Sequence, residues 1–411
     1  MSYSELGVTL LSLRHLKAVS VVCRLQSVTQ AARHLRRSQS TITMAIKDIE
    51  KCLGVHLFNR VGRRIEPTVY ATALNRGIEA AMQEFTTAAR LHTKLIGNSS
   101  DVRPNPVFSI DISYKRYAAL LALDKYSNVR LAADRLSISK TAVYKSVNEL
   151  ESQLSLKLFD RGKFETKSTL FCSQLSRHAR LAFTHLRHAV DELAGIDGIT
   201  CGKINIGMLP YSRSFLLPRA VGRLLEAYPE LSILTREGTY STLETPLMSG
   251  ELDLIVGATR PGKKNKTLKS ENLFEDKLVL VTSTSHPLAK LKKVSIDKLR
   301  NQYWLLPALD TPARQLFESF LERSGLMSPE HFIETSSLTF IRGLLLENDH
   351  VALLSAHQVS REVKHGMLSV LPVELGNTNR PIGIIMRNIP YQAPGLRLLI
   401  SQLRQVVLEL K

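Results

Sequence analysis

The stretch AARHLRRSQSTITMAIKDIEKCLGVHLFNR, residues 31–60, recurs 101 positions later as AADRLSISKTAVYKSVNELESQLSLKLFDR, residues 132–161. The two stretches align without a gap, nine of their thirty positions are identical, and both end in Leu-Phe-x-Arg. Only two copies occur. The pattern therefore indicates a duplicated domain rather than a solenoid of many repeats.

The apolar positions of each copy predict three short helices. In the first copy a helical stripe runs from Leu13 to Cys23, and residues 29–35 make a second, short helix. Ser38 can cap a third helix that runs to Leu53. This is a helix-turn-helix arrangement, whose second element can enter the major groove with its N-terminus first.

The residues after the third helix predict a two-stranded wing. A basic tip of Gly62, Arg63 and Arg64 leads to Pro67. The chain has 411 residues and a formal net charge of +18, and residues 1–100 hold 14 Lys and Arg against 6 Asp and Glu. Such an excess favours a polyanion partner, most often nucleic acid, although it can also serve solubility alone.

The motifs AARHLRRSQ (31–39), EKCLG (50–54) and LFNR (57–60) resemble the DNA-binding domain of LysR-type transcriptional regulators. The second copy departs more from that pattern, with Lys140 where Gln is usual and Ser155 where Gly is usual. The resemblance implies a sequence-specific DNA-binding transcription regulator whose operator binding is modulated by a small-molecule effector.

A groove-reading helix needs polar side chains near its N-terminus and cations beside it that meet phosphates. The resemblance assigns base contacts to Gln39, Ser40 and Thr43, and backbone contacts to Ser38 and the wing arginines. Simple capping and solvation is the alternative for each residue. The first-copy candidates are Arg36, Arg37, Ser38, Gln39, Ser40, Thr43, Lys47, Arg63 and Arg64, and the second-copy candidates are Ser139, Lys140, Thr141, Tyr144, Lys145 and Lys163.

Two roles remain open for the second copy. It could read a second half-site, or it could have lost DNA contact and serve only as a dimerisation or scaffold module. If both copies bind, one chain resembles a covalent dimer of DNA-binding domains, which raises affinity only if the linker spans the two grooves.

Each copy is followed by an apolar stripe at helical spacing. In the family this linker helix dimerises; here the two helices could pair within one chain, or each stripe could pack on its own domain. Between them the polar stretch 97–106 predicts a flexible tether. The stripes are Leu74, Ile78, Ala81, Phe85, Ala88 and Leu95, then Leu175, Ala179, Ala182, Leu186, Val190 and Leu193.

From Gly202 onward, short β-rich runs alternate with helical stretches. KINIGML, LSILTREG and LDLIVGA are the first such runs, and further candidate strands cover 277–282, 303–306, 331–334 and 351–354. The alternation predicts α/β units with mostly parallel sheets, whose ligands bind beyond the carboxyl ends of the strands.

Four blocks of this half resemble the LysR effector domain, most closely its galactose-binding-protein regulator subgroup. They are GMLPYSRSFLLPRAV, EGTYSTLETPLMSGELDLIVGA, LFEDKLVLV with HPLA, and LLSAHQV. The fold class that follows is two α-helical winged helix-turn-helix domains with linker helices, then an α/β two-lobed domain similar to type II periplasmic binding proteins. The expected divisions are 10–70 and 111–170 for the winged domains, 71–96 and 171–196 for the linker helices, 97–110 for the tether, 201–276 with 381–411 for lobe I and 277–380 for lobe II.

Loops that follow strands should line the cleft between the lobes. Hydroxyls near helix N-termini, with an arginine, suit a carboxylate or a sugar-like polyol, because free N–H groups and the helix dipole favour an anion there. Helix capping is the alternative reading of the same hydroxyls. The effector-binding candidates are Ser212, Arg213, Tyr240, Ser241, Thr259, Pro307, Thr311 and Ser355.

No sequence motif indicates an enzyme, a cofactor or a metal site. A nucleophile elbow, a P-loop, an H-E-x-x-H motif and a dinucleotide fingerprint are all missing, and the four cysteines lie far apart. We therefore expect no cofactor and a cytoplasmic protein with reduced thiols and no membrane association. The expected partners are double-stranded DNA, a small-molecule effector and further copies of the chain, with RNA polymerase as a candidate. A ligand-insensitive architectural DNA-binding protein is the alternative function.

Overall fold

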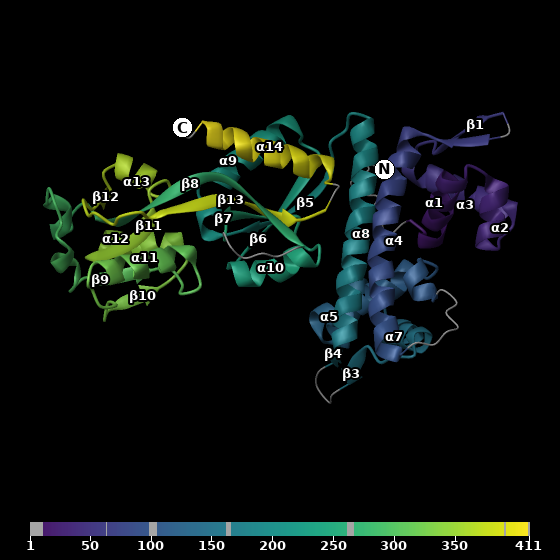
Figure 1. Ribbon diagram of the computed structural model, residues 1–411, viewed down its shortest axis with the longest axis horizontal. Coiled ribbons are helices and arrows are strands. Elements are labelled where there is room, and N and C mark those ends of the chain that lie inside the picture. The colour runs from purple at the N-terminus through teal and green to yellow at the C-terminus, as the bar shows by residue number, and fades with distance from the viewer. Residues whose placement is uncertain are drawn as a thin grey trace.

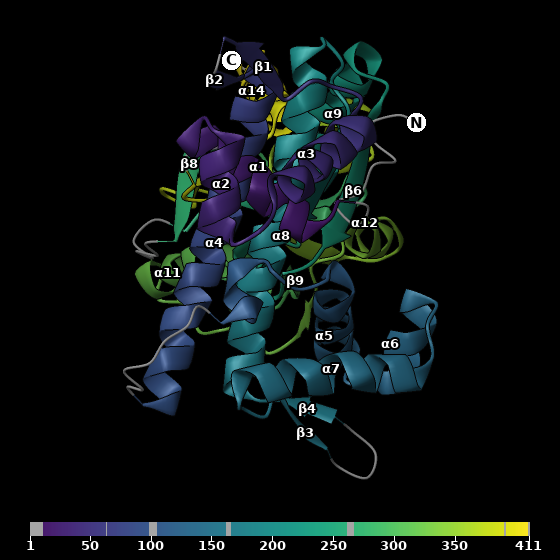
Figure 2. The ribbon, with the colours of Figure 1, turned by 90° about the vertical axis from the view of Figure 1, so that its right-hand side faces the viewer.

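The computed structural model describes residues 11–62, 64–97, 105–161, 166–260, 267–389 and 392–409. Two three-helix heads adjoin a central pair of long helices, and an α/β domain lies on the other side of that pair from the first head (Figure 1). Seen from the side, the heads occupy opposite ends of the pair (Figure 2). None of the described helices is long and apolar enough to cross a membrane.

The first head forms as the repeat predicts. Ser27 caps its second helix by accepting a hydrogen bond from the Gln30 N–H, and Ser38 caps the third by accepting from the Thr41 N–H. The adjacent small residues Ala31 and Ala32 are buried and let these helices approach closely. Its elements are α1 (Leu13–Leu25), α2 (Val28–Leu35), α3 (Gln39–Leu53), β1 (Phe58–Val61) and β2 (Arg64–Pro67).

The second head repeats these elements about 101 residues later. Asn128 and Ser139 take the capping positions of Ser27 and Ser38. The end of the predicted tether forms a 3-10 turn, η2, whose Val107 is fully buried. The elements are η2 (Pro106–Ser109), α5 (Tyr114–Tyr126), α6 (Val129–Leu136), α7 (Lys140–Leu154), β3 (Phe159–Arg161) and β4 (Thr166–Ser168).

The backbone of the two heads matches even at its unusual conformations. Among the described residues, each head has three residues in the left-handed region that end its α-helices, and corresponding residues are 101 positions apart. Only one of the six is a glycine. The pairs are Gln26 and Ser127, Arg36 and Ser137, and Gly54 and Ser155.

The two linker helices, α4 (Val69–Ile96) and α8 (Leu170–Ile196), pack against each other within the chain. Their apolar stripes are buried as predicted, except that Leu95 is 57% exposed because it lies in the last turn of α4. At Gly77 the helices approach so closely that a Cβ atom would lie 2.4 Å from the Ala189 Cβ. The stripes therefore join the two copies to each other.

The α/β domain contains one continuous nine-stranded sheet. Its strands are β5 (Gly202–Met208), β6 (Leu231–Glu237), β7 (Leu254–Ala258), β8 (Leu268–Ser283), β9 (Tyr303–Leu306), β10 (Phe332–Glu334), β11 (His350–Ser355), β12 (Leu368–Val370) and β13 (Asn379–Arg387). Its α-helices are α9 (Leu216–Ala227), α10 (Tyr240–Met248), α11 (Pro312–Arg323), α12 (Leu338–Glu347), α13 (Ser360–Lys364) and α14 (Pro394–Leu408). Its 3-10 turns are η3 (Pro210–Arg213), η4 (Pro287–Lys290) and η5 (Ile296–Leu299).

The sheet is mixed, so the prediction of mostly parallel pairing was wrong. β5 pairs in parallel with β6 and β7, and β9 pairs in parallel with β10 and β11. β8 and β13, however, are antiparallel to all their neighbours. The chain crosses from one group of strands to the other along β8 and returns along β13. These two strands therefore run in opposite directions, and their pairing is antiparallel.

The long strands divide the sheet into two lobes. The first part of β8 pairs with β13 beside β5, β6 and β7, and residues Leu278–Val281, closer to its end, pair with β11. Helices α9 and α14 cover one face of the first lobe, whose core is separate from those of the second lobe. The sequence predicts only 277–282 as a strand here, because the exposed and charged first half of β8 lacks an apolar run.

Candidate DNA-binding heads and effector cleft

The exposed end of α3 carries the predicted base-reading residues of the first head. Ser38 Oγ lies 2.8 Å from Ser40 Oγ and accepts the Thr41 N–H at 3.1 Å, so this hydroxyl is part of the cap. Gln39 and Ser40 are exposed, whereas Thr43 is half-buried one turn further along. Arg36, Arg37, Lys47 and Arg64 are exposed around them, and Arg63 lies outside the described residues.

A carboxylate that the residue predictions missed holds the wing to the recognition helix. Glu50 Oε1 accepts the Leu57 N–H at 2.7 Å, and in the second head Glu151 Oε1 accepts the Leu158 N–H at 2.8 Å. Burial acts to raise the pKa of Glu151, but the backbone N–H donors and the Lys157 ammonium outweigh it and lower that pKa. Both copies of the repeat carry glutamate at this position, and this identity is the sequence feature that could have indicated the role of Glu50 and Glu151.

The second head presents its candidates in the same way. Ser139 Oγ accepts the Ala142 N–H at 3.1 Å, as a cap does. Lys140, Thr141 and Lys145 are exposed, and Tyr144 is half-buried. Lys163 lies outside the described residues.

A cavity of about 100 Å³ opens between the lobes of the α/β domain. Four predicted residues line it from both lobes: Tyr240, Pro307, Thr311 and Ser355. Burial and the neighbouring Glu244 carboxylate raise the pKa of Tyr240 to about 12, so its hydroxyl stays protonated at neutral pH. Most of the remaining wall is apolar, including Leu209, Leu278, Leu338, Ile341 and Leu353.

Two other predicted residues lie beside the first strand of the domain, outside the cavity wall. Ser212 is fully buried, and its hydroxyl donates to the Leu209 carbonyl at 3.0 Å. Arg213 pairs with Glu237 at 3.0 Å and reaches backbone carbonyls. Both side chains therefore hold the turn after β5 together.

The other two lie at helix and strand ends and do not line the cavity wall. Ser241 is exposed, with its hydroxyl 2.9 Å from Thr239 Oγ1 at the start of α10. Thr259 is buried and donates to Asn272 Oδ1 at 2.8 Å. These hydroxyls serve local caps and strand contacts.

Arg260, which was not predicted, contributes positive charge to the cavity wall. The Arg260 guanidinium lies 4.5 Å from the centre of the Tyr240 ring, and its Nη2 donates to the Asp310 carbonyl of the other lobe at 2.8 Å. Gln358 also joins the lobes, because its Nε2 donates to the Pro210 carbonyl at 3.2 Å. Only the folded chain brings these residues together, since they are far apart in the sequence.

A buried carboxylate organises the floor of the cleft. Asp276 is fully buried at the point where β8 crosses between the lobes. It accepts hydrogen bonds from Ser355 Oγ at 2.6 Å and Arg380 Nε at 3.1 Å, and it lies 3.2 Å from His357 Nδ1. Arg380 lines the cavity, and the Asp276 carboxylate balances its positive charge.

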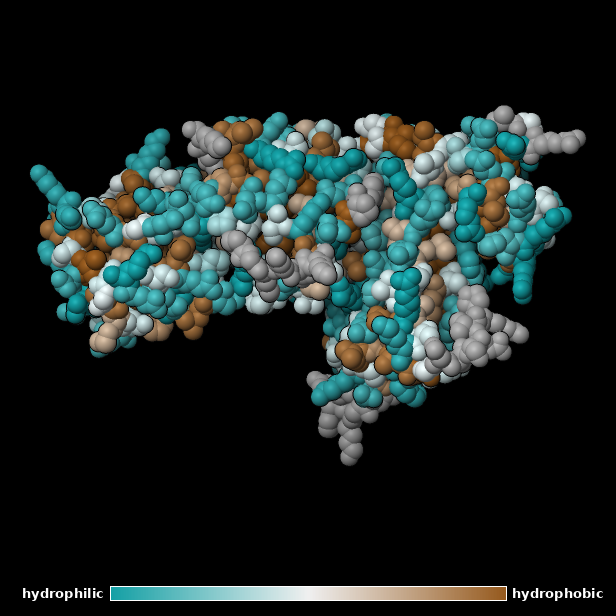
Figure 3. Space-filling view, viewed as in Figure 1, coloured by the Kyte–Doolittle hydropathy of each residue, from teal (hydrophilic) through white to brown (hydrophobic). Residues whose placement is uncertain are grey.

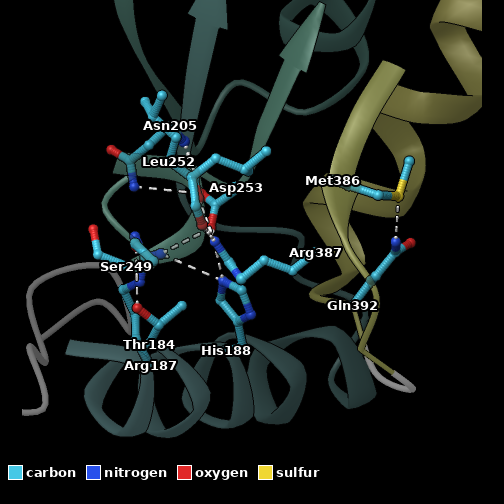
Figure 4. Close-up of polar contacts among 12 residues, drawn as sticks. Thr184, Arg187, His188, Asn205, Ser249, Leu252, Asp253, Met386, Arg387 and Gln392 are labelled. Atoms are coloured by element: carbon cyan, nitrogen blue, oxygen red, sulfur yellow. Dashed lines mark hydrogen bonds and ion pairs between the residues drawn. The ribbon is translucent and has the colours of Figure 1, made fainter. Parts of the chain in front are cut away.

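A second buried carboxylate connects the α/β domain to the linker pair (Figure 4). Asp253 Oδ1 lies 3.2 Å from His188 Nε2 and 3.3 Å from Arg187 Nη2, both on α8, and Oδ2 accepts the Asn205 N–H at 2.8 Å. Arg387 of β13 lies 3.7 Å from the same carboxylate. Burial acts to raise the pKa of Asp253, but these partners lower it well below its ordinary value.

Comparison with known proteins assigns these parts to one family. Residues 198–408 match the model of the LysR substrate binding domain. Residues 13–72 and 114–170 each match the model of the bacterial regulatory helix-turn-helix protein, lysR family. The duplicated heads are thus two copies of the same family domain.

Known relatives are named transcriptional regulators. The HTH-type transcriptional regulator GalR of Pseudomonas putida is 29% identical over 404 residues, which cover 98% of this chain and 99% of that protein. The HTH-type transcriptional regulator PcaQ of Agrobacterium fabrum is 28% identical over 299 residues, 73% of this chain and 96% of its own. The match to PcaQ leaves about a quarter of this chain unmatched, roughly the length of one copy.

Solved structures show the same fold at low sequence identity. Full-length OxyR from Pseudomonas aeruginosa matches with a TM-score of 0.52 at 18% identity, over 72% of this chain and 94% of that one. CbnR, a LysR family transcriptional regulator, matches with a TM-score of 0.52 at 16% identity, over 72% of this chain and 99% of its own. The chain belongs to the LysR family of bacterial transcriptional regulators, with a DNA-binding helix-turn-helix and an effector-binding domain.

Proposed function

We propose that this regulator reads operator DNA with the N-terminal end of α3 and binds a small carboxylate with an apolar body between the lobes of its α/β domain. It acts on the chromosome in the cytoplasm. The observation that carries the effector assignment is the Arg260 guanidinium, which lies in a mostly apolar cavity wall beside Tyr240.

The DNA contact is supported by the surface around α3. Exposed Gln39 and Ser40 can reach base edges, while exposed Arg36, Arg37 and Lys47 can meet phosphates. The cap formed by Ser38 leaves other N–H groups of the first turn free to face a phosphate. Sequence preference would then come from the polar side chains and affinity from the cations.

The cavity favours a carboxylate over a sugar-like ligand. A sugar needs hydrogen-bonding partners on most of its faces, but the wall is mostly apolar. A carboxylate with an apolar body needs one charged partner, which Arg260 can supply, and few other polar contacts. Because Arg260 also contacts Asp310 of the other lobe, a bound carboxylate would change how the lobes are held together.

The effector assignment can be tested by thermal unfolding of the full chain with small aromatic and aliphatic carboxylates and their neutral amides. We expect at least one carboxylate to raise the unfolding temperature while its amide does not. Arg260→Ala should weaken that ligand at least about 10-fold because a charge-assisted hydrogen bond is lost. Arg397→Ala, which removes an exposed arginine from α14, is the charge-matched control. Equal binding of acid and amide would contradict the proposal.

The DNA assignment is tested separately, by gel shift with a pool of random-sequence duplexes at low salt. The full chain should retain a fraction of the pool, and sequencing of that fraction should show an enriched motif. A chain that binds ligand but retains no duplex would contradict DNA reading by α3 without affecting the effector assignment.

A further inference from the structure

The paired linker helices have an approximate two-fold axis inside one chain. His185 stands 101 positions after Glu84, so the two residues occupy equivalent places in the two copies. They nevertheless face each other, with Glu84 Oε1 3.8 Å from His185 Nε2. In a symmetric pair, a residue meets its own equivalent only beside the two-fold axis. The axis of the pair therefore passes close to this contact.

Contacts on both sides of this point show that the helices are antiparallel. As the position along α4 rises, the position of its partner along α8 falls, from the start of one helix to the end of the other. The contacting pairs are Tyr70 with Asp197, Arg76 with Glu192, Gly77 with Ala189, Phe85 with Phe183 and His92 with Phe171. This order places the two heads at opposite ends of the pair, as Figure 2 shows.

Each head is joined to its own linker helix by the same contacts. Thr68 caps α4 by accepting the Ala71 N–H, and its own N–H donates to the Leu57 carbonyl at 2.9 Å. Thr169, 101 positions later, caps α8 and donates its N–H to the Leu158 carbonyl at 2.9 Å. Because the joints match and the helices are related by an approximate two-fold axis, the heads are related by that axis as well.

The reading surface of the second head is uncovered. Lys140, Thr141 and Lys145 are exposed on α7. The space-filling view shows the second head projecting beyond the α/β domain (Figure 3). Its framework is complete, with the Ser139 cap and the Glu151 contact to the wing both formed. A module kept only for dimerisation does not need exposed cations at the start of its recognition helix.

We infer that the two heads of one chain form a single DNA-reading unit that binds two inverted half-sites on one duplex. The half-sites are unlike, because Lys140, Thr141 and Tyr144 stand where the first head has Gln39, Ser40 and Thr43. A two-fold axis in the protein matches inverted half-sites in the DNA, and α3 and α7 are the readers. The inference rests on the proposed DNA reading by α3 and adds a second site on α7.

The test is duplex selection and titration with three forms of the full chain. One is unaltered, one carries Gln39→Ala, Ser40→Ala and Lys47→Ala, and one carries Lys140→Ala, Thr141→Ala and Lys145→Ala. These substitutions spare the capping serines, and thermal unfolding checks that each variant folds. Lys125→Ala, at the far end of α5, is the control for loss of a positive charge on the second head. Each form selects from random-sequence duplexes, and the unaltered chain's motif is then used in a titration.

The unaltered chain should select two unlike half-sites in inverted order and saturate the motif at one chain per duplex. The second-head variant should lose only one half-site and bind the full motif about 100-fold more weakly, because the linked second contact is gone. Its salt dependence should also become shallower, by about two phosphate contacts. Lys125→Ala should bind like the unaltered chain.

Two results overturn the inference. One is a second-head variant with unaltered motif and affinity, which would leave α7 as a scaffold. The other is saturation at two chains per motif, which would show that each chain uses one head. In either case a weakened first-head variant would leave the proposed function standing, whereas a first-head variant that binds normally would remove the proposed role of α3 itself.

Discussion

Ser155 ends α7 in the left-handed region, with φ of 52°, where the first head has Gly54 with φ of 71°. A side chain in this region costs about 1 kcal/mol relative to glycine. We expect Ser155→Gly to raise the free energy of unfolding by about 1 kcal/mol, measured by urea denaturation. Ser152→Gly, three residues earlier inside the same helix, should lower it by a similar amount, because glycine is unfavourable in a helix. Stabilisation by both changes would contradict this explanation.

Gln39 and Thr43 differ from Arg64 in what each can contribute to DNA binding. The first two lie on α3 near its exposed end, and Arg64 is an exposed cation on the wing. Gln39→Ala with Thr43→Ala should reduce discrimination between selected and random duplexes, because side chains that reach bases are lost. Arg64→Ala should weaken binding to all duplexes about equally and lower the salt slope by about 1. Unchanged discrimination in the double variant would exclude base reading by these residues.

The cleft residues show what single positions can and cannot predict. A hydroxyl after a strand can belong to a residue that lines the cavity, as Thr311 and Ser355 do, or to one that lies outside the cavity wall, as Ser212 does, and all three donate to groups of the chain itself. The local sequence is similar in both cases. Arg260 and Arg380 could not be predicted from local sequence, because they reach the cavity only when β8 and β13 bring the lobes together.

The linker helices depend on one close approach. A Cβ atom at Gly77 would lie 2.4 Å from the Ala189 Cβ and 2.9 Å from the His185 carbonyl oxygen. We expect Gly77→Ala to destabilise the chain by about 1 to 3 kcal/mol because the helices must move apart. Gly222→Ala, in α9 with nothing within 4 Å of its Cβ position, should instead stabilise by up to about 1 kcal/mol. Calorimetry of both variants tests this expectation. Equal stabilisation by the two substitutions would show that α4 and α8 do not approach closely at Gly77.

Elements made from local contacts were predictable, and those made by long-range pairing were not. The heads follow from serine caps, alanine pairs and apolar spacing within 30 residues, and the repeat confirms each feature twice. The direction of β8 and β13 depends on which lobe the chain enters next, and no local pattern carries that information. Strand positions were therefore predicted better than strand pairing.

The stability of the whole molecule should depend on pH through Asp191, a buried side chain of α8 that lies beside Gly202 of the α/β domain. Burial, and to a lesser extent the nearby Asp253, raises the pKa of Asp191 from its ordinary value of 3.8 to about 7, although Arg187 opposes the shift. The folded chain thus holds a proton that the unfolded chain releases between about pH 4 and 7. Stability should fall as pH rises through this window, by at most about 1.4 kcal/mol per pH unit.

Asp191→Asn tests this prediction, because the amide resembles the protonated acid but does not titrate. The variant should remove that part of the pH dependence and be more stable than the unaltered chain at pH 8, as measured by urea denaturation across pH 4–8. Asp197→Asn, on the exposed end of α8, should keep the slope. A slope that survives in the Asp191 variant would assign it to other groups.

The pairing of α4 with α8 inside one polypeptide also bears on how such a regulator behaves at low abundance. Helices from separate chains part on dilution and can exchange with those of related proteins. Covalent continuity between these two keeps the heads matched at any copy number, and it prevents a paralogue from replacing one of them. The two heads of one molecule therefore stay paired through α4 and α8 however few copies a cell holds.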